Sequence, residues 1–428
     1  MSESVLIRGG HLIDPAQKID EPRDVLLQDG KIAEVALPGK IKGADQIIDA
    51  KGLIVAPGFI DLHVHLREPG QSHKETIKSG TMAAAAGGFT SVCAMPNTAP
   101  INDSPALTRW MMDSDRGAVV NVFPIAAATV GSAGEKLTDY RALQEAGAVG
   151  VTDDGKPVLD DSLMASALGA ASKLDMVVIQ HAEDTRLSKG GVMNLGATSF
   201  RLGLRGQPPE SEFQLVERDV RLAFDEKARM HVAHISTAQA LEYVRMGKRA
   251  GARVTCEVCP HHFLFTEEDC ATYDTSYKMN PPLRTAADRE ALLRGIEDGS
   301  VDAIATDHAP HAQYEKFVEF DKAAFGITGL EVALGAAITH IHRARKVPLS
   351  RIVQLFTAGP ASVVSLSGRG TLKKGSFADV TIFDPKKKWT YDVRKSRSKA
   401  RNAPYDGMEF YGRVIATIVG GRIVFDAR

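Results

Sequence analysis

The middle of the chain alternates apolar strand-like segments with helix-like segments, and this alternation restricts the possible folds more than any other feature. Strands separated by helical segments pair in parallel, and eight such units are typical of a (β/α)8 barrel of the TIM type. An open doubly wound sheet is the alternative, although no G-x-G-x-x-G motif follows the first strand. The eight predicted strands are residues 58–65, 89–95, 119–126, 148–153, 176–181, 230–234, 253–258 and 303–307.

The two ends of the chain show a different sequence pattern, in which short strand-like segments are separated by turn residues. Asp29-Gly30 marks a hairpin near the N-terminus, and Gly420-Gly421 marks another near the C-terminus. Neither end is large enough to enclose a core alone. We therefore expect residues 1–56 and 366–428 to form one small β-sandwich domain, and residues 57–365 to form the catalytic, metal-binding barrel.

The charge balance excludes several kinds of partner. With 52 basic and 53 acidic residues the net charge is −1, which gives no general attraction for nucleic acid or an anionic membrane. No basic N-terminal region precedes an apolar segment, and no apolar run approaches the ~20 residues of a membrane span. We expect a cytoplasmic protein without a nucleic-acid or membrane partner.

The cysteines are too few for a disulfide framework, since there are four in 428 residues. Cys256 and Cys259 form a C-x-x-C motif, which His261 and His262 follow directly. A structural zinc site is one interpretation, but these histidines lie too close in sequence to form the usual second half of such a site. A buried strand with small thiol side chains is the other, and we expect that one.

Histidines and carboxylates stand at the ends of the predicted barrel strands. His63 and His65 are two residues apart, so an extended strand directs both side chains to one face. A barrel places its active site at these strand ends, and imidazoles with carboxylates are ligands of zinc and similar ions. Two ions could be held if one carboxylate bridges them. The further candidates are Asp153, Asp154, His181, His234 and Asp307.

A second set of polar residues at strand ends is suited to bind an anion and an amide. Arg67 can bind a carboxylate with two hydrogen bonds, and Asn97 and His308 can add directed ones. Asn280 belongs to the same set. Residues 311–324 form a connection long enough to act as a mobile lid that excludes water.

Three motifs stand out, namely D-L-H-V-H-L-R-E-P-G at 61–70, G-F-T-S-V-C-A-M-P-N at 88–97 and T-D-H-A-P-H at 306–311. They resemble those of the type I bacterial dihydroorotases, a family of the amidohydrolase superfamily, and the resemblance runs nearly end to end. H-x-H alone marks only the superfamily, whereas H-x-H-x-R-E-P-G together with M-P-N is far more specific. Further likeness lies at residues 258–263, 325–331 and 402–409.

This resemblance implies a zinc centre, with two ions favoured over one and Asp154 as the bridge. Asp154 is preferred to Asp153 because its spacing to His181 matches the family pattern better. A carboxylated Lys156 is the less favoured bridge. The implied metal ligands are His63, His65, Asp154, His181, His234 and Asp307.

The resemblance also implies the reaction, which is the reversible cyclisation of N-carbamoyl-L-aspartate to L-dihydroorotate in de novo pyrimidine (UMP) biosynthesis. In the hydrolytic direction a metal-activated hydroxide attacks the ring amide, and Asp307 serves as general base and acid. Arg67, Asn97 and His308 would bind the substrate carboxylate. Asn280 and the backbone of Phe325 and Gly326 would hold the ring, and His65 would also contact the substrate.

Other functions stay open at this point. A dihydropyrimidinase or hydantoinase would share the metal site, but such an enzyme need not bind a substrate carboxylate, so Arg67 argues against it. Allantoinase is the nearer alternative. A non-catalytic scaffold for aspartate carbamoyltransferase would have lost metal ligands, and none of the six is missing here. We expect a small-molecule substrate and a homodimer, and association with that transferase is open.

Overall fold

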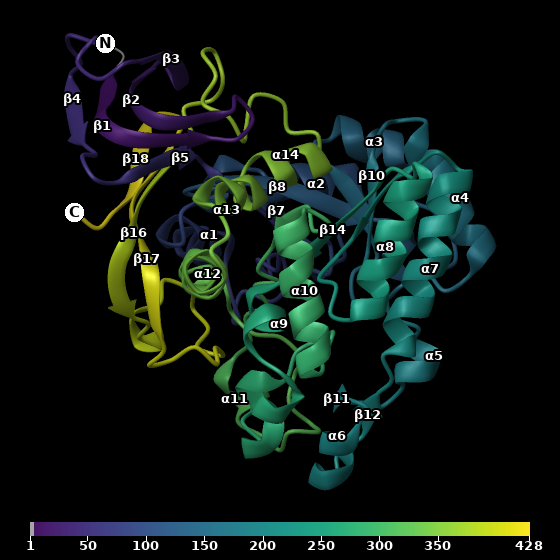
Figure 1. Cartoon of the computed structure of the whole chain (residues 1–428). Coiled ribbons are helices and arrows are strands. Elements are labelled where there is room, and N and C mark those ends of the chain that lie inside the picture. Colours follow the sequence, from purple (N-terminus) through teal and green to yellow (C-terminus); the bar gives the residue numbers. More distant parts are fainter. Residues whose placement is uncertain (1–3) are drawn as a thin grey trace.

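The computed structural model describes residues 4–428, and the middle of the chain forms a nearly closed barrel (Figure 1). Eight strands pair in parallel, each with its neighbour in the chain order of the barrel. A backbone hydrogen bond of 2.9 Å from His65 N to His308 O joins the first strand to the end of the last. The strands are β6 (Phe59–Val64), β7 (Phe89–Ala94), β8 (Asn121–Ala127), β9 (Gly150–Thr152), β10 (Val177–Gln180), β13 (Arg229–Val232), β14 (Val254–Val258) and β15 (Ala303–Ile304).

Helices surround this barrel, as the alternation of the sequence predicts, and their ends follow local signals. One helix starts after Thr237, whose side chain accepts a hydrogen bond from Ala240 N, and ends at Gly251 with a φ of 90°. The helices are α1 (Ile77–Ala86), α2 (Pro105–Met111), α3 (Tyr140–Glu145), α4 (Asp161–Ser172), α5 (Thr185–Ser188), α6 (Ala197–Leu202), α7 (Glu210–Asp225), α8 (Ala238–Ala250), α9 (Pro260–Leu264), α10 (Ala286–Asp298), α11 (Gln313–Lys316), α12 (Ala333–Ala337), α13 (Leu349–Phe356) and α14 (Ala358–Val363). Within residues 4–428 no helix is both long and apolar enough to span a bilayer.

The two ends of the chain build a second sheet with its own core, which confirms the predicted β domain. Its order is β18-β17-β16-β5-β1-β2-β3, with β4 beside β1. Buried side chains from both ends, such as Ile7 and Ile418, share one hydrophobic cluster. The strands are β1 (Val5–Asp14), β2 (Ile19–Gln28), β3 (Lys31–Ala36), β4 (Gln46–Asp49), β5 (Ile54–Pro57), β16 (Val380–Thr390), β17 (Glu409–Val419) and β18 (Arg422–Asp426).

Both hairpin signals lie where the sequence places them. Asp29 and Gly30 connect β2 to β3 with φ values of 53° and 71°, and Gly420 and Gly421 connect β17 to β18 with 55° and 80°. Such positive values at both loop positions match the twist of the flanking strands. Strand β5 was not predicted, and it is the element that joins the two halves of the sheet, since it pairs with both β1 and β16.

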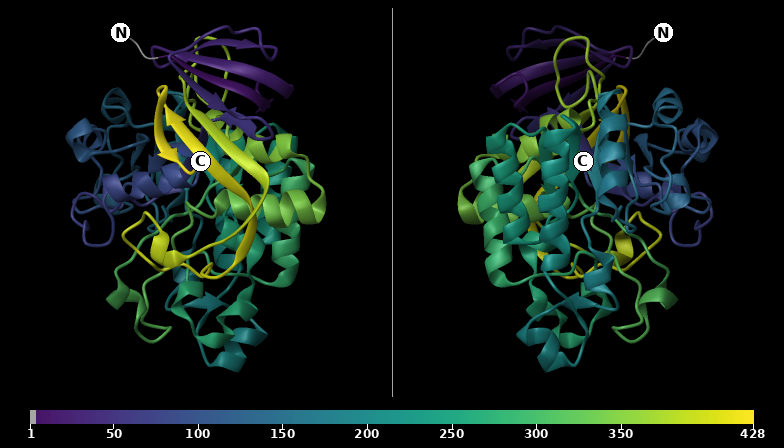
Figure 2. Two further views of the ribbon diagram at one scale, coloured as in Figure 1. Left: turned by 90° about the vertical axis from the view of Figure 1, so that its left-hand side faces the viewer. Right: turned by 90° about the vertical axis from the view of Figure 1, so that its right-hand side faces the viewer.

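Aromatic side chains fix the terminal sheet to the end of the barrel where its strands begin. Phe59, the first residue of β6, stacks on Phe356 at 5.2 Å and contacts Phe383 of β16 at 6.0 Å between ring centroids. The loops that carry α6, α11 and the short strands β11 (Met193–Asn194) and β12 (Gly206–Gln207) lie at the opposite end (Figures 1 and 2). The strand ends that carry the predicted site therefore remain free of the terminal sheet.

The predicted domain limits at 56/57 and 365/366 remain predictions. The chain passes from the terminal sheet to the barrel between Pro57, the end of β5, and Phe59. The last helix of the barrel region, α14, ends at Val363.

Candidate active site

A cavity of about 260 Å³ opens at the carboxyl ends of the barrel strands. Pockets for drug-sized ligands usually measure ~300–1,000 Å³, so this one suits a small metabolite. Most of the predicted site residues line the cavity, and His63 and His308 do not. The lining residues are His65, Arg67, Asn97, Asp154, Gly155, His181, His234, Asn280, Asp307, Ala309, His311, Phe325 and Gly326.

One group of potential metal ligands comes from strand β6 and the loop after β9. His63, His65 and Asp154 each offer an atom within 4.8 Å of the others. His63 Nε2 lies 3.4 Å from Asp154 Oδ1, and His65 Nε2 lies 3.7 Å from Asp154 Oδ2. Asp307, after β15, adds its Oδ1 at 3.1 Å from His65 Nε2 and 3.6 Å from His63 Nε2.

A second group shares the same aspartate. Asp154, His181 after β10 and His234 after β13 also present atoms within 4.8 Å of one another. His181 Nδ1 lies 3.0 Å from His234 Nε2 and 3.8 Å from Asp154 Oδ1. Asp154 thus stands between two sets of imidazoles, so its two oxygens could serve two ions.

The residues fit a divalent ion of the zinc type. Both ring nitrogens of His63 and Nδ1 of His234 are buried without a hydrogen-bond partner, and an unpaired buried group of this kind costs ~1–3 kcal/mol. Burial alone would raise the pKa of Asp154, but His63, His65 and His181 hold that pKa well below its usual value. A set of imidazole and carboxylate donors is the usual ligand set of zinc.

Glu257, which the sequence analysis did not single out, lies beneath His63. Its Oε1 is 3.5 Å from His63 Nδ1, and its Oε2 accepts from His231 Nε2 at 3.1 Å. Burial would raise the pKa of Glu257, but the two histidines lower it to about 2. A carboxylate on the second nitrogen of a ligand histidine fixes the tautomer and the ring orientation. The sequence signal for Glu257 was a charged residue inside a largely apolar strand.

Glu183 and Asn97 contact the candidate ligand histidines His181 and His65 on the ring nitrogens that face away from the proposed ions. Glu183 Oε2 lies 2.9 Å from His181 Nε2, and its pKa is about 2 because His181 outweighs the effect of burial. Asn97 Oδ1 lies 2.8 Å from His65 Nδ1, while its Nδ2 donates to Asp154 Oδ2 at 3.0 Å. Glu183 was missed, although it follows His181 by two residues. Asn97 is predicted to bind substrate, and in this structure its amide contacts His65 and Asp154.

Of the side chains predicted to bind an anion, Arg67 lines the cavity. His308 does not reach the cavity, because its Nε2 faces Glu75 Oε2 at 3.4 Å and its Nδ1 accepts from Gly329 N. The histidine beside Arg67 is His311, whose Nε2 lies 3.4 Å from Arg67 Nη2. The T-D-H-A-P-H motif contains both His308 and His311, so the sequence leaves open which of the two histidines lies beside Arg67.

Asn280 and the backbone at Phe325 and Gly326 lie at the cavity, but several of their polar groups are already paired. Asn280 Nδ2 donates to Glu183 Oε2 at 2.7 Å. Gly326 N donates to a backbone carbonyl at 3.0 Å, and Phe325 O accepts from His311 Nε2 at 2.7 Å. The ring-holding role predicted for these groups would need some of these bonds to exchange.

Three site residues have backbone conformations that side chains rarely adopt. Arg67, His234 and Asp307 have φ values of 63°, 32° and 45°. Such positions cost of order 1–3 kcal/mol and persist where the surroundings fix them, which is typical of functional sites. Each lies at a strand end, where the positive φ turns the chain sharply beside the cavity.

The alternatives to Asp154 lie elsewhere. Asp153 turns away and accepts hydrogen bonds from the backbone and hydroxyl of Thr129. Lys156 is exposed to solvent and does not line the cavity.

The segment 311–324, predicted as a lid, includes α11 and is tied down in this structure. Lys316 Nζ donates to the carbonyls of Lys278, Ala324 and Gly326 at 2.8–3.1 Å. Glu315 pairs with Lys74 at 2.7 Å, which links this segment to the loop after β6. Mobility of the segment remains a prediction.

Two family models match the chain. The dihydro-orotase-like model covers residues 52–240, and the amidohydrolase family model covers residues 215–425. Among solved structures, an L-hydantoinase (dihydropyrimidinase) from Arthrobacter aurescens superposes with a TM-score of 0.88 at 24% identity, covering 100% of this chain and 96% of that one. The dihydropyrimidinase of Brevibacillus agri NCHU1002 gives 0.85 at 23%, covering 99% and 95%. At these identities the likeness shows the fold alone.

Curated relatives are much more similar in sequence. A dihydroorotase of Solibacter usitatus is 51% identical over 97% of this chain and 97% of its own length. A dihydroorotase of Geobacter sp. strain M21 is 47% identical over 99% of this chain and 100% of its own length. Identity at this level over nearly the whole length shows the family, and the chain therefore belongs to the dihydroorotase family of the amidohydrolase superfamily.

Proposed function

We propose that this protein is a dihydroorotase, an enzyme that interconverts N-carbamoyl-L-aspartate and L-dihydroorotate in de novo pyrimidine biosynthesis. The observation that carries the proposal is that one cavity holds both the histidine–aspartate centre and the buried guanidinium of Arg67. A cyclic amide that carries a carboxylate needs both. The relatives named dihydroorotase support the same substrate pair.

We infer that the centre would hold two zinc ions: His63, His65 and Asp307 would hold one, His181 and His234 would hold the other, and both would share Asp154. The two ligand groups that have Asp154 in common support this count. Bound zinc would supply Lewis acidity, lowering the pKa of water to about 7 and polarising the amide carbonyl. Metal analysis of the purified protein tests both the identity and the number of the ions.

Asp307 is the residue we assign to proton transfer. Its Oδ1 faces His65 and His63, so Oδ2 remains to take a proton. During hydrolysis this oxygen accepts the proton of the attacking water and passes it to the amide nitrogen that leaves the carbonyl carbon. In the cyclisation direction the same carboxylate removes the proton from that nitrogen and returns it to the oxygen that departs as water.

Arg67 is the residue we assign to the substrate carboxylate. Its Nε donates to Pro310 O at 3.1 Å, which orients the guanidinium, and its Nη2 lies 3.4 Å from His311 Nε2, while Nη1 is left for a ligand. We place His311 in this receptor instead of His308, and Asn280 and Gly326 at the ring. Asn97 reaches the substrate only if its bond to Asp154 or His65 is exchanged.

Turnover of four substrates tests the proposal. Zinc-loaded protein is assayed with L-dihydroorotate, N-carbamoyl-L-aspartate, allantoin and dihydrouracil, and metal content is measured on the same sample. Preferential, chelator-sensitive turnover of the first pair is expected. Preference for allantoin or dihydrouracil would keep the metal mechanism and overturn the substrate. No turnover despite bound metal would favour the scaffold or a partner-dependent enzyme, which adding aspartate carbamoyltransferase would separate.

Quaternary structure and location stay proposals of the sequence analysis. We propose a homodimer in the cytoplasm, with association to aspartate carbamoyltransferase open. Light scattering of the protein alone and mixed with that transferase tests both associations.

A further inference from the structure

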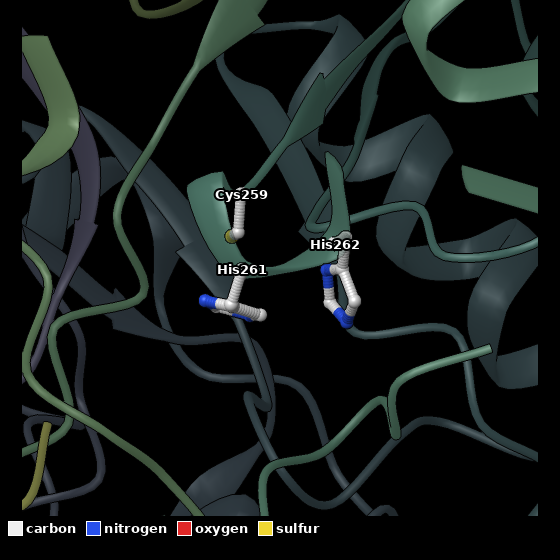
Figure 3. Close-up of side chains that lie close together, drawn as sticks. All are labelled: Cys259, His261 and His262. Atoms are coloured by element: carbon white, nitrogen blue, oxygen red, sulfur yellow. The ribbon is translucent and has the colours of Figure 1, made fainter. Parts of the chain in front are cut away.

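Cys259, His261 and His262 form a second buried group of metal-binding side chains, separate from the catalytic centre (Figure 3). Each offers one ligand atom within 4.8 Å of the other two. All three come from the end of β14 and the first residues of α9, and none of them lines the catalytic cavity. Their exposed fractions are 0%, 1% and 3%.

The two imidazoles lack the hydrogen bonds that buried rings usually have. Neither ring nitrogen of His261 has a partner, and neither has Nδ1 of His262. The rings nevertheless lie side by side, with centroids 4.3 Å apart. An unpaired buried nitrogen is destabilising, so three in one place call for a partner that compensates them.

The fourth ring nitrogen of the two histidines, Nε2 of His262, has a hydrogen-bond partner that fixes the tautomer of this ring. His262 Nε2 lies 3.0 Å from Pro281 O, so it carries the proton and donates it to this carbonyl. The tautomer leaves a lone pair on Nδ1, on the side of the ring that faces His261 (Figure 3). Metal-binding histidines typically have their second nitrogen bound to a backbone carbonyl or carboxylate in this way.

The two cysteines of the C-x-x-C motif have different surroundings. Cys256 Sγ lies 3.6 Å from Ser300 O, so it points away from the group although it is equally buried. Only Cys259 joins the histidines. The structure therefore does not support a site built on the C-x-x-C pair, and it offers one made of a single thiol and two imidazoles.

We propose that Cys259, His261 and His262 bind one soft monovalent ion, Cu(I), with the thiol proton released to solvent. A thiolate donor selects soft ions such as Cu(I) or zinc. Structural zinc is almost always four-coordinate, and among residues 4–428 no fourth histidine, cysteine or carboxylate joins this group. One thiolate also neutralises a single positive charge, whereas a divalent ion would leave a net charge in a buried position.

Titration of the full-length, zinc-loaded protein with Cu(I) tests the proposal. Under anaerobic conditions Cu(I) is supplied as a coloured chelator complex, and the copper and zinc bound to the protein are both measured. We expect one copper per chain with unchanged zinc, and X-ray absorption with sulfur and nitrogen neighbours. Copper that stays with the chelator, replaces zinc one for one, or has no sulfur neighbour would overturn the proposal.

Two serine variants locate the ion. Cys259→Ser should weaken Cu(I) binding by at least ~100-fold, beyond what loss of an outer partner usually costs. Cys256→Ser changes an equally buried thiol of the same segment and should bind copper like the parent chain. Equal binding by both variants would contradict the assignment. If a variant fails to fold, the X-ray absorption spectrum of copper in the unmodified protein still decides whether sulfur is a ligand.

Discussion

His311 should make the protein lose stability as the pH falls below neutrality. Its side chain is 8% exposed, Nε2 lies 2.7 Å from Phe325 O, and Nδ1 has no hydrogen-bond partner. Burial, followed by the nearby charge of Arg67, lowers the pKa of His311 to about 3. The nearest carboxylate, Glu315, is 3.5 Å away and is already paired with Lys74.

The sign and size of the effect follow from proton binding. The folded chain keeps His311 neutral, whereas the same residue in the unfolded chain has a pKa of about 6.5. Between these two values the unfolded chain binds more protons, so stability rises with pH and falls on acidification. Protonation of one unfolded histidine between pH 7 and pH 5 amounts to about 2 kcal/mol, and this holds for any folded pKa well below 5.

Urea unfolding of metal-free protein at pH 7 and pH 5 measures this contribution. His311→Gln should lose about 2 kcal/mol less stability than the parent chain over the interval, since one titrating group is gone. Metal-free protein is used so that the release of zinc does not contribute to the pH dependence of the free energy of unfolding. The other histidines contribute equally in the parent and in the variant, so they cancel in the comparison. His73→Gln, which removes an exposed histidine, should behave like the parent. Identical pH dependence of His311→Gln and the parent would refute the reasoning.

Three substitutions test the roles assigned at the catalytic centre. Glu257→Gln should weaken zinc binding by ~10–100-fold in a chelator competition, because the amide carries no charge and would place an NH2 group against either His63 or His231. Unchanged affinity would exclude that positioning role. Asp307→Asn should retain much of the metal and reduce kcat by ~10²–10⁴, since an amide cannot carry the proton, and near-normal turnover would remove Asp307 as the base. Arg67→Ala should raise KM more than it lowers kcat, with a loss of ~1.5–3 kcal/mol in binding, and an unchanged KM would contradict the receptor.

Much of the fold could be predicted because its signals are local. Apolar strands, helix caps such as Thr237 and turn pairs such as Asp29-Gly30 act within a few residues, and the chain folds accordingly. Strand β5 was missed because its four residues continue almost directly into β6, so one apolar run contains strands of two different sheets. The pairing of β5 with β1 and with distant β16 separates them.

Which candidate ligand residues gather can be predicted from the sequence, since the ends of all barrel strands converge on one face and His63, Asp154 and Asp307 stand at or near such ends. The tertiary structure alone decided which neighbouring side chains face the cavity. Alternation along a strand stops where Asp307 takes a φ of 45°, so spacing could not assign His308 to the outside and His311 to the inside. Side-chain direction beyond a strand end depends on contacts that distant segments of the chain supply.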